Sequence, residues 1–468
     1  MKRYDDRNGL AYTATRPESA ETFADLTSAY MRFLPETGDI LDDLFAEDPE
    51  MPMAICAKGY FAKLMGNGED ARRARDFSQK LDDRLDSTSA NERERRHASA
   101  LSAWTAGQLG RATDFWEQIL LDDPRDGLAL SLAHFAHLYS GDGRRIRDSI
   151  ARVLPLWPKD HPDYGYLLGM YAFGLEESGE YTQAEAYGRR AVECNPQDAW
   201  SVHSVAHVME MTGRYEEGVE WVAGLEPSWS TVNNFRFHLY WHQCLYHLEC
   251  SEFAQALQLY DDQVVSDIAS DLPLDMCNAT SLLWRLEMFG VDIGGRWQEL
   301  AEIAKNHIDD TDLIFVSLHH LMALTANGDT IAAERMLDTI RRWSRLDTSQ
   351  SKICASVGIA LAESLSHARH KEHHKVIEKL ERVRYDFDQI GGSKAQRDVF
   401  HMILLDAAQA GTDVVKARAL FAERVGQRAH SHWSWQGYST VLKSLGQDTA
   451  AREAAAKASE IRAAHATH

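Results

Sequence analysis

The chain has 468 residues, more than one compact core usually supports, so its length predicts several domains or one elongated repeat array. A net charge of −21, with no long basic tract, disfavours nucleic acid as a partner. No apolar run is long enough for a membrane span or a signal peptide, and the six cysteines lack CxxC spacing, so we predict a cytoplasmic protein without a membrane partner.

The composition predicts an all-helical fold. The chain has only 11 prolines, mostly at the ends of helix-like segments, and the stretches between them are rich in Ala, Leu, Glu and Arg. We expect an N-terminal helical region of divergent repeats over residues 1–90. The charged run EDARRARDFSQKLDDRL in this region indicates the exposed face of an amphipathic helix.

Residues 91–265 are expected to hold regular tetratricopeptide repeats. Two segments, 163–196 and 198–227, align directly, and each shows a helix-length apolar pattern, a Gly-x-Tyr pair and a second helix that ends near a proline. Gly179 and Gly213, which open the two pairs, lie 34 residues apart, and this is the period of tetratricopeptide repeats. The period predicts roughly nine to twelve antiparallel helix pairs in the whole chain.

The repeat pattern changes after residue 265. We expect an irregular insertion over residues 266–310, because the period is broken there. Residues 311–468 are expected to hold C-terminal repeats, and the Ala-rich segment 432–462 is expected to cap the stack. The predicted fold class is an all-α, tetratricopeptide-repeat-like α-solenoid of stacked antiparallel helix pairs that forms a curled superhelix.

Six stretches of sequence are more specific than the repeat period. They are ERERRHASA, FWEQILLDDPRDGLAL, DAWSVHSVAHVMEM, HLYWHQCLY, LLWRLEMFGVDIGGRW and GGSKAQRDVF. Together they resemble the tetratricopeptide repeat protein 38 family, which includes StaR-like proteins associated with bacterial glycopeptide-antibiotic clusters. The resemblance extends over about residues 20–430 and implies a helical-repeat fold, but no particular reaction.

Three polar residues share one stripe of a predicted helix in the stretch DAWSVHSVAHVMEM. His203, His207 and Glu210 stand at positions i, i+4 and i+7. The family resemblance implies that this helix, the first of its pair, lines the concave groove. The next first helix carries His238 and His242, again four apart, and neighbouring helices lie about 8–10 Å apart, so the two sets can meet.

Three interpretations of these residues are open. His203, His207, Glu210 and His238 could bind a divalent metal ion such as zinc. Without a metal, His203, His207, Glu210 and His242 could act as general acids and bases or bind a polar small molecule. The third interpretation is that the histidines are hydrogen-bonded between helices and only specify packing.

Further side chains could line a ligand pocket around the histidines. They are Phe173, Glu176, His238, Trp241, Arg285, His320 and Arg397. Either arginine could hold a carboxylate or phosphate through two parallel hydrogen bonds, although an ion pair with a local acid is a simpler role for Arg397.

The sequence leaves two functions open. The first is a binding scaffold whose concave groove holds a small molecule, or else a peptide or protein partner. We favour the small molecule, because His, Glu and aromatic side chains suit a small ligand better than a peptide. The alternative is an enzyme, a hydrolase or lyase acting on a small polar substrate, with or without a divalent metal. The sequence makes no prediction of the oligomeric state.

Overall fold

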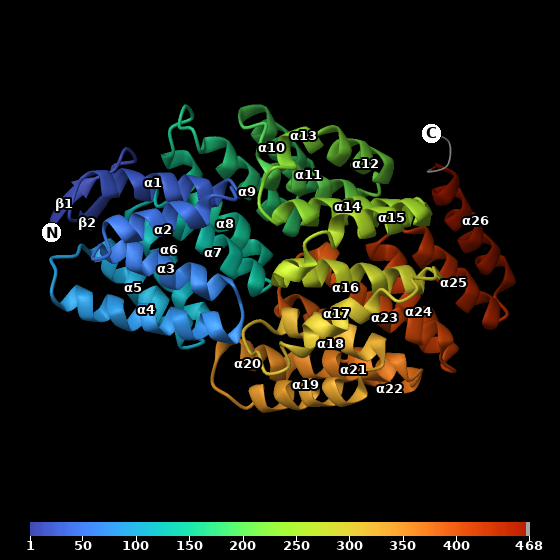
Figure 1. Ribbon diagram of the computed structural model, residues 1–468. Helices are drawn as coiled ribbons and strands as arrows, with labels where there is room; N and C mark the ends of the chain where they lie inside the picture. The colour runs from blue at the N-terminus through green and yellow to red at the C-terminus, as the bar shows by residue number, and fades with distance from the viewer. Residues whose placement is uncertain (465–468) are drawn as a thin grey trace.

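Almost all of the regular secondary structure is helical in the structure, a computed structural model that describes residues 1–464 (Figure 1). A two-stranded antiparallel hairpin precedes them, with β1 at Lys2–Asp5 and β2 at Ala11–Ala14. The hairpin adds two short strands to the N-terminal region that was expected to be helical. Thr13 donates from its backbone N–H and its hydroxyl to the Glu94 carboxylate, so contacts with a later helix hold residue 13 in an extended strand.

The helices of the first half are α1 (Glu18–Met31), α2 (Thr37–Glu47), α3 (Pro52–Leu64), α4 (Gly68–Asp86), α5 (Glu92–Thr105), α6 (Leu109–Asp122), α7 (Gly127–Tyr139), α8 (Gly143–Val153), α9 (Tyr164–Glu177), α10 (Tyr181–Cys194), α11 (Ala199–Thr212), α12 (Tyr215–Gly224) and α13 (Glu226–Trp229). Those of the second half are α14 (Phe235–Glu249), α15 (Phe253–Leu259), α16 (Pro273–Met288), α17 (Trp297–Lys305), α18 (Ile314–Asn327), α19 (Thr330–Trp343), α20 (Ser349–Ile353), α21 (Ile359–Arg369), α22 (His373–Leu380), α23 (Lys394–Ala410), α24 (Val414–Gln427), α25 (His432–Ser444) and α26 (Asp448–Ala464). Among residues 1–464, none of them is both long and apolar enough to cross a bilayer.

Consecutive helices pack in pairs, which confirms the predicted all-α solenoid. Within residues 1–464 the pairs are α1/α2, α3/α4, α5/α6, α7/α8, α9/α10, α11/α12, α14/α15, α16/α17, α18/α19, α21/α22, α23/α24 and α25/α26. First helices of neighbouring pairs also touch: α9 contacts α11, and α14 contacts α16. The segment 266–310, expected to be irregular, contains the pair α16/α17 after a short 3₁₀ turn at Ile268–Ser270.

The turns inside two pairs follow from the Gly-x-Tyr motif. Gly179 and Gly213 adopt φ values of +82° and +72°, a left-handed conformation that strains any residue with a Cβ. α10 and α12 then begin at the tyrosines of the motif. α10 ends two residues before Pro196, whereas Pro227 lies in the first turn of α13, where a missing N–H costs no hydrogen bond.

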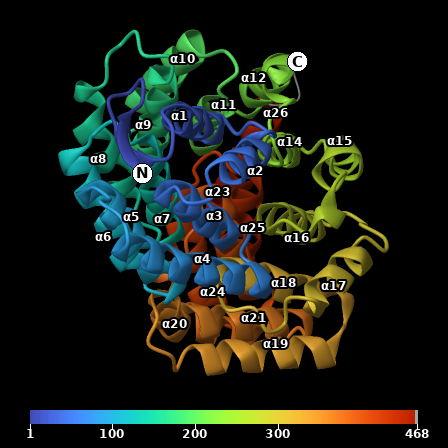
Figure 2. The ribbon, with the colours of Figure 1, turned by 60° about the vertical axis from the view of Figure 1, so that its left-hand side comes forward.

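The solenoid curls until distant parts of the chain touch (Figure 2). The Ser349 N–H donates to the Gly107 carbonyl at 2.9 Å, and the Gln108 side-chain amide donates to the Asp347 carbonyl at 2.7 Å. These bonds join the turn between α5 and α6 to the start of α20. The molecule is therefore a closed ring of helix pairs instead of an open spiral.

One helix of the chain, α23, lies inside this ring, where Figure 2 shows it in red among the surrounding helices. Lys394 donates from Nζ to the Glu176 carbonyl at 2.9 Å, which joins α23 to α9. Arg285 of α16 donates from Nη2 to the Ala395 carbonyl at 2.7 Å. α23 thus fills the concave side between α9 and α16.

Candidate functional site

α11 carries the stripe of His203, His207 and Glu210 that the sequence predicted. The side chain of Asp198 caps this helix by accepting from the Ser201 N–H at 3.1 Å. α9, α10, α12 and α14 pack around it, and its residues from 199 to 210 are all buried. Because protein surrounds the helix, the polar stripe meets other side chains and not bulk solvent.

Two histidines of α11 and two of α14 meet in a four-histidine cluster, composed of His203, His207, His238 and His242. One ring nitrogen of each lies within 4.8 Å of the corresponding nitrogens of the other three. The Nε2 atom of His203 is 2.9 Å from Nε2 of His207 and 3.1 Å from Nε2 of His238. The ring centroids of His207 and His242 are 4.5 Å apart. The repeat geometry therefore brings together the two histidine pairs that are 35 residues apart in sequence.

Oxygen atoms face the other ring nitrogen of three of these histidines. The distances are 2.8 Å from His238 Nδ1 to Asn278 Oδ1, 3.3 Å from His242 Nδ1 to Glu210 Oε2, and 3.6 Å from His207 Nδ1 to Glu176 Oε2. The other oxygen of Glu210 lies 3.7 Å from Arg428 Nη1. The centre of the cluster is thus lined by imidazole nitrogen, and carboxylate and amide oxygens lie around it.

Burial controls the protonation of this region. It lowers the pKa of His203, His207 and His238 well below the usual value for histidine, and the neighbouring histidines lower it further. Burial also raises the pKa of the Glu176 carboxyl well above its usual value, and Glu177 adds to this shift. The three imidazoles are therefore neutral at pH 7, and each keeps the lone pair that can bind a metal ion.

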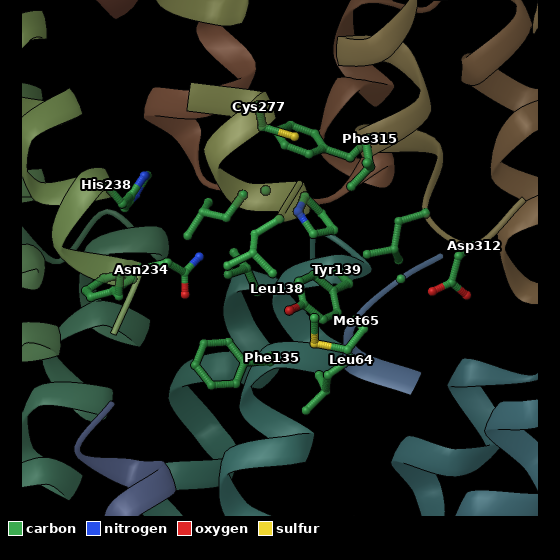
Figure 3. Close-up of a pocket in the computed structure, with 18 of the residues that line it drawn as sticks. Leu64, Met65, Phe135, Leu138, Tyr139, Asn234, His238, Cys277, Asp312 and Phe315 are labelled. Carbon is green, nitrogen blue, oxygen red and sulfur yellow. The ribbon is translucent and has the colours of Figure 1, made fainter. Parts of the chain in front are cut away.

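A cavity of about 470 Å³ lies beside the four-histidine cluster (Figure 3). His203 and His238 belong to its lining, whereas His207 and His242 lie behind them. Much of the lining is aromatic and comes from distant parts of the chain, including Tyr30, Phe33, Phe61, Phe135, Trp200, Phe235 and Phe315. The volume falls within the range of small-molecule sites, which is about 300–1,000 Å³.

Charged groups gather on the side of the cavity away from the cluster, where Figure 3 shows Asp312. Lys63 pairs with Asp312. The ring of His307 lies between two carboxylates, 2.8 Å from Asp271 and 2.6 Å from Asp310. Burial alone would lower the pKa of His307, but the hydrogen bonds to these carboxylates raise it to about 9. His307 is therefore charged at pH 7, so the cavity has a neutral end and an ionic end.

Several residues predicted as ligand-binding lie at or near the cavity. Phe173 belongs to the lining and stacks on His203, with ring centroids 5.4 Å apart. His320 also belongs to the lining. Trp241 stacks on His238 with centroids 5.0 Å apart, but it lies behind the lining, as Glu176 does. These two side chains therefore support the histidines from behind.

Arg285 and Arg397, which were also predicted to bind a ligand, are not part of the cavity lining. Arg285 uses its guanidinium on the Ala395 carbonyl. Arg397 donates to the Gly392 carbonyl and lies 3.5 Å from the carboxylate of Glu177. Both arginines make these contacts because α23 lies inside the ring. The sequence did not reveal this position of α23.

The structure also changes the set of residues at the centre of the predicted metal site. The nitrogen of His242 takes the place that the prediction gave to Glu210. Glu210 lies behind His242, at 3.3 Å from its Nδ1. A second group with converging ligand atoms consists of Glu176, Glu177 and His207, so His207 faces both the cluster and these carboxylates.

Sequence reasoning missed the side chains that close the cavity and the amide behind His238. Phe33 comes from the N-terminal part of the chain, and its ring stacks on that of Trp200 at 5.8 Å. Asn278 lies on α16, where no spacing marks it as a partner of α14. Both contacts depend on how far the solenoid curls, and a repeat period does not encode this.

No protein-family model matches the sequence. A human IFIT1 dimer with PPP-AAAA is 13% identical over 84% of this chain and 87% of that chain, with a TM-score of 0.39. A human IFIT1 dimer with m7Gppp-AAAA is 13% identical over 96% of each chain, with a TM-score of 0.36. Naa15/Naa10 bound to HypK-THB is 11% identical over 93% of this chain and 68% of that chain, with a TM-score of 0.23. Likenesses this weak say nothing about what this chain binds.

Proposed function

We propose that this protein binds a small, mainly apolar molecule in the cavity, with the four-histidine cluster at one end of it. The cavity carries this proposal. Its volume of about 470 Å³ suits a small ligand, and its aromatic walls gain free energy by excluding water from an apolar surface. The few polar groups at its two ends would orient the ligand.

The position of α23 supports a small ligand over a peptide. An extended peptide needs an open concave groove, and here Lys394 and Arg397 tie α23 to α9 on that side of the solenoid. A peptide would have to displace a helix of the chain itself, whereas a small molecule needs only the existing cavity.

Membership in the tetratricopeptide repeat protein 38 family is part of the proposal, and the six sequence stretches quoted above support it. A cytoplasmic location is also proposed, because six scattered cysteines without CxxC spacing suit a reducing compartment. The net charge of −21 supports the proposal that neither nucleic acid nor a membrane surface is a partner.

Substitution of an aromatic wall residue tests ligand binding. Phe135→Ala removes a half-buried ring from the cavity lining and should weaken binding of the fluorescent apolar probe 1-anilinonaphthalene-8-sulfonate about tenfold, since that factor corresponds to about 1.4 kcal/mol of lost contact. Fluorescence titration of the full chain measures the dissociation constant.

Phe115→Ala is the matched control. Phe115 is also half-buried, but it lies on α6 outside the cavity lining, and its loss should leave the probe affinity unchanged. Equal weakening by both substitutions, or no saturable binding by the unsubstituted protein, would overturn the proposal.

A hydrolase or lyase acting on a small polar substrate is the second candidate. It is favoured by one observation: His203 and His238 reach the cavity while carboxylates stand behind their neighbours. Such an enzyme should lose turnover of its substrate in His238→Ala while Phe135→Ala mainly raises KM. Assays of ester and amide hydrolysis and of β-elimination with the purified chain check this, and inactivity in all of them would count against it.

A further inference from the structure

The hydrogen-bonding capacity of the four-histidine cluster does not match its geometry. A neutral imidazole has one N–H donor and one nitrogen lone pair. Nε2 of His203 lies within hydrogen-bonding distance of Nε2 of both His207 and His238. This atom carries either one proton or one lone pair in the plane of the ring, so it cannot form a well-aligned hydrogen bond with both neighbours. In any assignment of protons, one of these two short nitrogen–nitrogen contacts therefore lacks a well-aligned hydrogen bond.

The outer partners make this mismatch worse. If Nδ1 carries the proton, His238 donates to Asn278 Oδ1 at 2.8 Å, whereas Nδ1 of His242 and of His207 only face carboxylate oxygens at 3.3 and 3.6 Å, without a hydrogen bond. The lone pairs of Nε2 then face one another at the centre. If Nε2 carries the protons instead, the Nδ1 lone pairs of His238 and His242 face oxygen atoms of Asn278 and Glu210.

We propose that a divalent transition-metal ion is bound at the centre of the four-histidine cluster by one nitrogen each of His203, His207, His238 and His242. The ion turns the facing lone pairs into ligand bonds, and the Nδ1–H groups of His207, His238 and His242 stay free for the oxygens that face them. Around a tetrahedral zinc ion, with bonds of about 2.0–2.1 Å, ligand nitrogens lie about 3.3–3.4 Å apart. The observed separations of 2.9 and 3.1 Å need to open by only a few tenths of an ångström.

The donor set restricts the metal. Four imidazole nitrogens suit zinc, copper, nickel or iron, whereas magnesium and calcium prefer oxygen ligands. Histidine ligands commonly donate their second N–H to a carboxylate or a carbonyl, and this fixes the ring. Glu176, Glu210 and Asn278 stand in these positions.

Unpaired buried atoms at the site support a missing partner. Within residues 1–464, the buried atoms without a hydrogen bond include Nδ1 of His203 and His207, both ring nitrogens of His242, both carboxylate oxygens of Glu176 and Oε2 of Glu210. A buried polar group without a partner costs about 1–3 kcal/mol, and more when it is charged. A bound cation would compensate several of these groups at once.

The position of the ion also defines the class of ligand, in a step that rests on the proposed function. His203 and His238 belong to the cavity lining, so the ion lies directly behind the cavity surface. Because the four histidines complete a tetrahedral shell, a molecule that fills the apolar part would bind the ion through a Lewis-basic group, such as a carboxylate, as a fifth ligand. We therefore expect bound metal to strengthen the binding of apolar carboxylates over that of equally sized neutral molecules.

Metal analysis of the full chain tests the site directly. Protein produced in medium supplemented with zinc and iron should hold about one transition-metal ion per chain after gel filtration. His203→Ala, His207→Ala, His238→Ala and His242→Ala should each lose most of it. His134→Ala is the control, because His134 is also buried, with its ring centroid 5.5 Å from that of Trp200, but belongs to no group of converging ligand atoms among the described residues.

A milder variant guards against loss of the fold. Glu210→Gln keeps the shape of the side chain and should weaken Zn²⁺ binding about 10- to 100-fold in competition with a chelating dye, with circular dichroism unchanged. Substoichiometric metal in supplemented protein, together with no rise in thermal stability on adding Zn²⁺, Co²⁺, Ni²⁺ or Fe²⁺, would overturn the inference. Saturable probe binding by metal-free protein would then leave the proposed function standing, whereas stoichiometric metal without probe binding would do the reverse.

Discussion

At the residue scale, histidines of this protein differ in charge because their neighbours differ. In the four-histidine cluster imidazole nitrogens lie close to one another, and burial lowers the pKa of His203, His207 and His238 and favours their neutral form. Across the cavity, His307 lies between the carboxylates of Asp271 and Asp310, and these favour the cation. The same residue type therefore provides metal-binding lone pairs at one end and a fixed positive charge at the other.

The charge on His307 predicts a pH dependence of stability. Its pKa of about 9 lies above the ordinary value near 6.5, so its stabilising contribution is complete below about pH 6.5 and is lost as the pH rises through 9. His307→Gln should flatten the decline in unfolding free energy over this interval, as measured by urea unfolding at several pH values. His370→Gln, at an exposed site, should keep the slope, and an unchanged slope in His307→Gln would refute the assignment.

The stripe of His203, His207 and Glu210 could be recognised from the sequence because it lies on one helix with fixed geometry. The partnership with His238 and His242 followed from repeat stacking. The role of His242 in place of Glu210 did not follow, because it depends on the rotation of α14 relative to α11 by a fraction of a turn. Asn278 could not be predicted either, because its contact with His238 depends on how α16 packs against α14.

At the element scale, helices are well predicted where their ends are marked by local chemistry. The left-handed glycines at 179 and 213 end helices where the motif places them. Aspartates that cap helix starts are also local signals, but their contributions to stability differ because some are buried and others exposed. Asp126 caps α7 and also binds two buried side chains, Arg93 at 2.6 Å and His97 at 3.0 Å, whereas Asp142 caps the more exposed start of α8.

These two caps predict different losses of stability. Asp142→Ala removes a cap and should cost about 1 kcal/mol. Asp126→Ala also leaves the guanidinium of Arg93 buried without its carboxylate, and should cost about 3–5 kcal/mol. Chemical denaturation of the two variants measures the difference. Similar losses would show that the buried ion pair contributes little.

At the scale of the whole molecule, the closed ring was beyond prediction from the sequence. The twelve helix pairs of residues 1–464 fall within the predicted range, but the repeat period does not determine how tightly successive pairs rotate. The closing contacts are specific instead: Gly141 adopts φ +66°, and a Cβ there would lie 1.8 Å from the Asp388 carbonyl oxygen. The segment that follows this contact includes Ile390 and Gly392, which line the cavity.

Closure of the ring can be tested at Gly141. Gly179→Ala is the matched control, since Gly179 has φ +82° but nothing within 4 Å of its Cβ position, and it should cost about 1–2 kcal/mol. Gly141→Ala adds a collision with backbone, and should cost roughly 1–3 kcal/mol more. It should also weaken probe binding by moving a cavity wall. Denaturation and fluorescence titration check both effects, and equal behaviour of the two variants would contradict the account.

The metal site is tested most directly by a crystal structure of protein purified from metal-supplemented medium, with anomalous diffraction collected on both sides of the absorption edge of the metal found by elemental analysis. A metal ion held by the cluster should give one anomalous peak per chain, within about 2.0–2.2 Å of one nitrogen of each of His203, His207, His238 and His242. A structure with no such peak, in which the four rings are rotated into ordinary hydrogen bonds, would contradict the metal site.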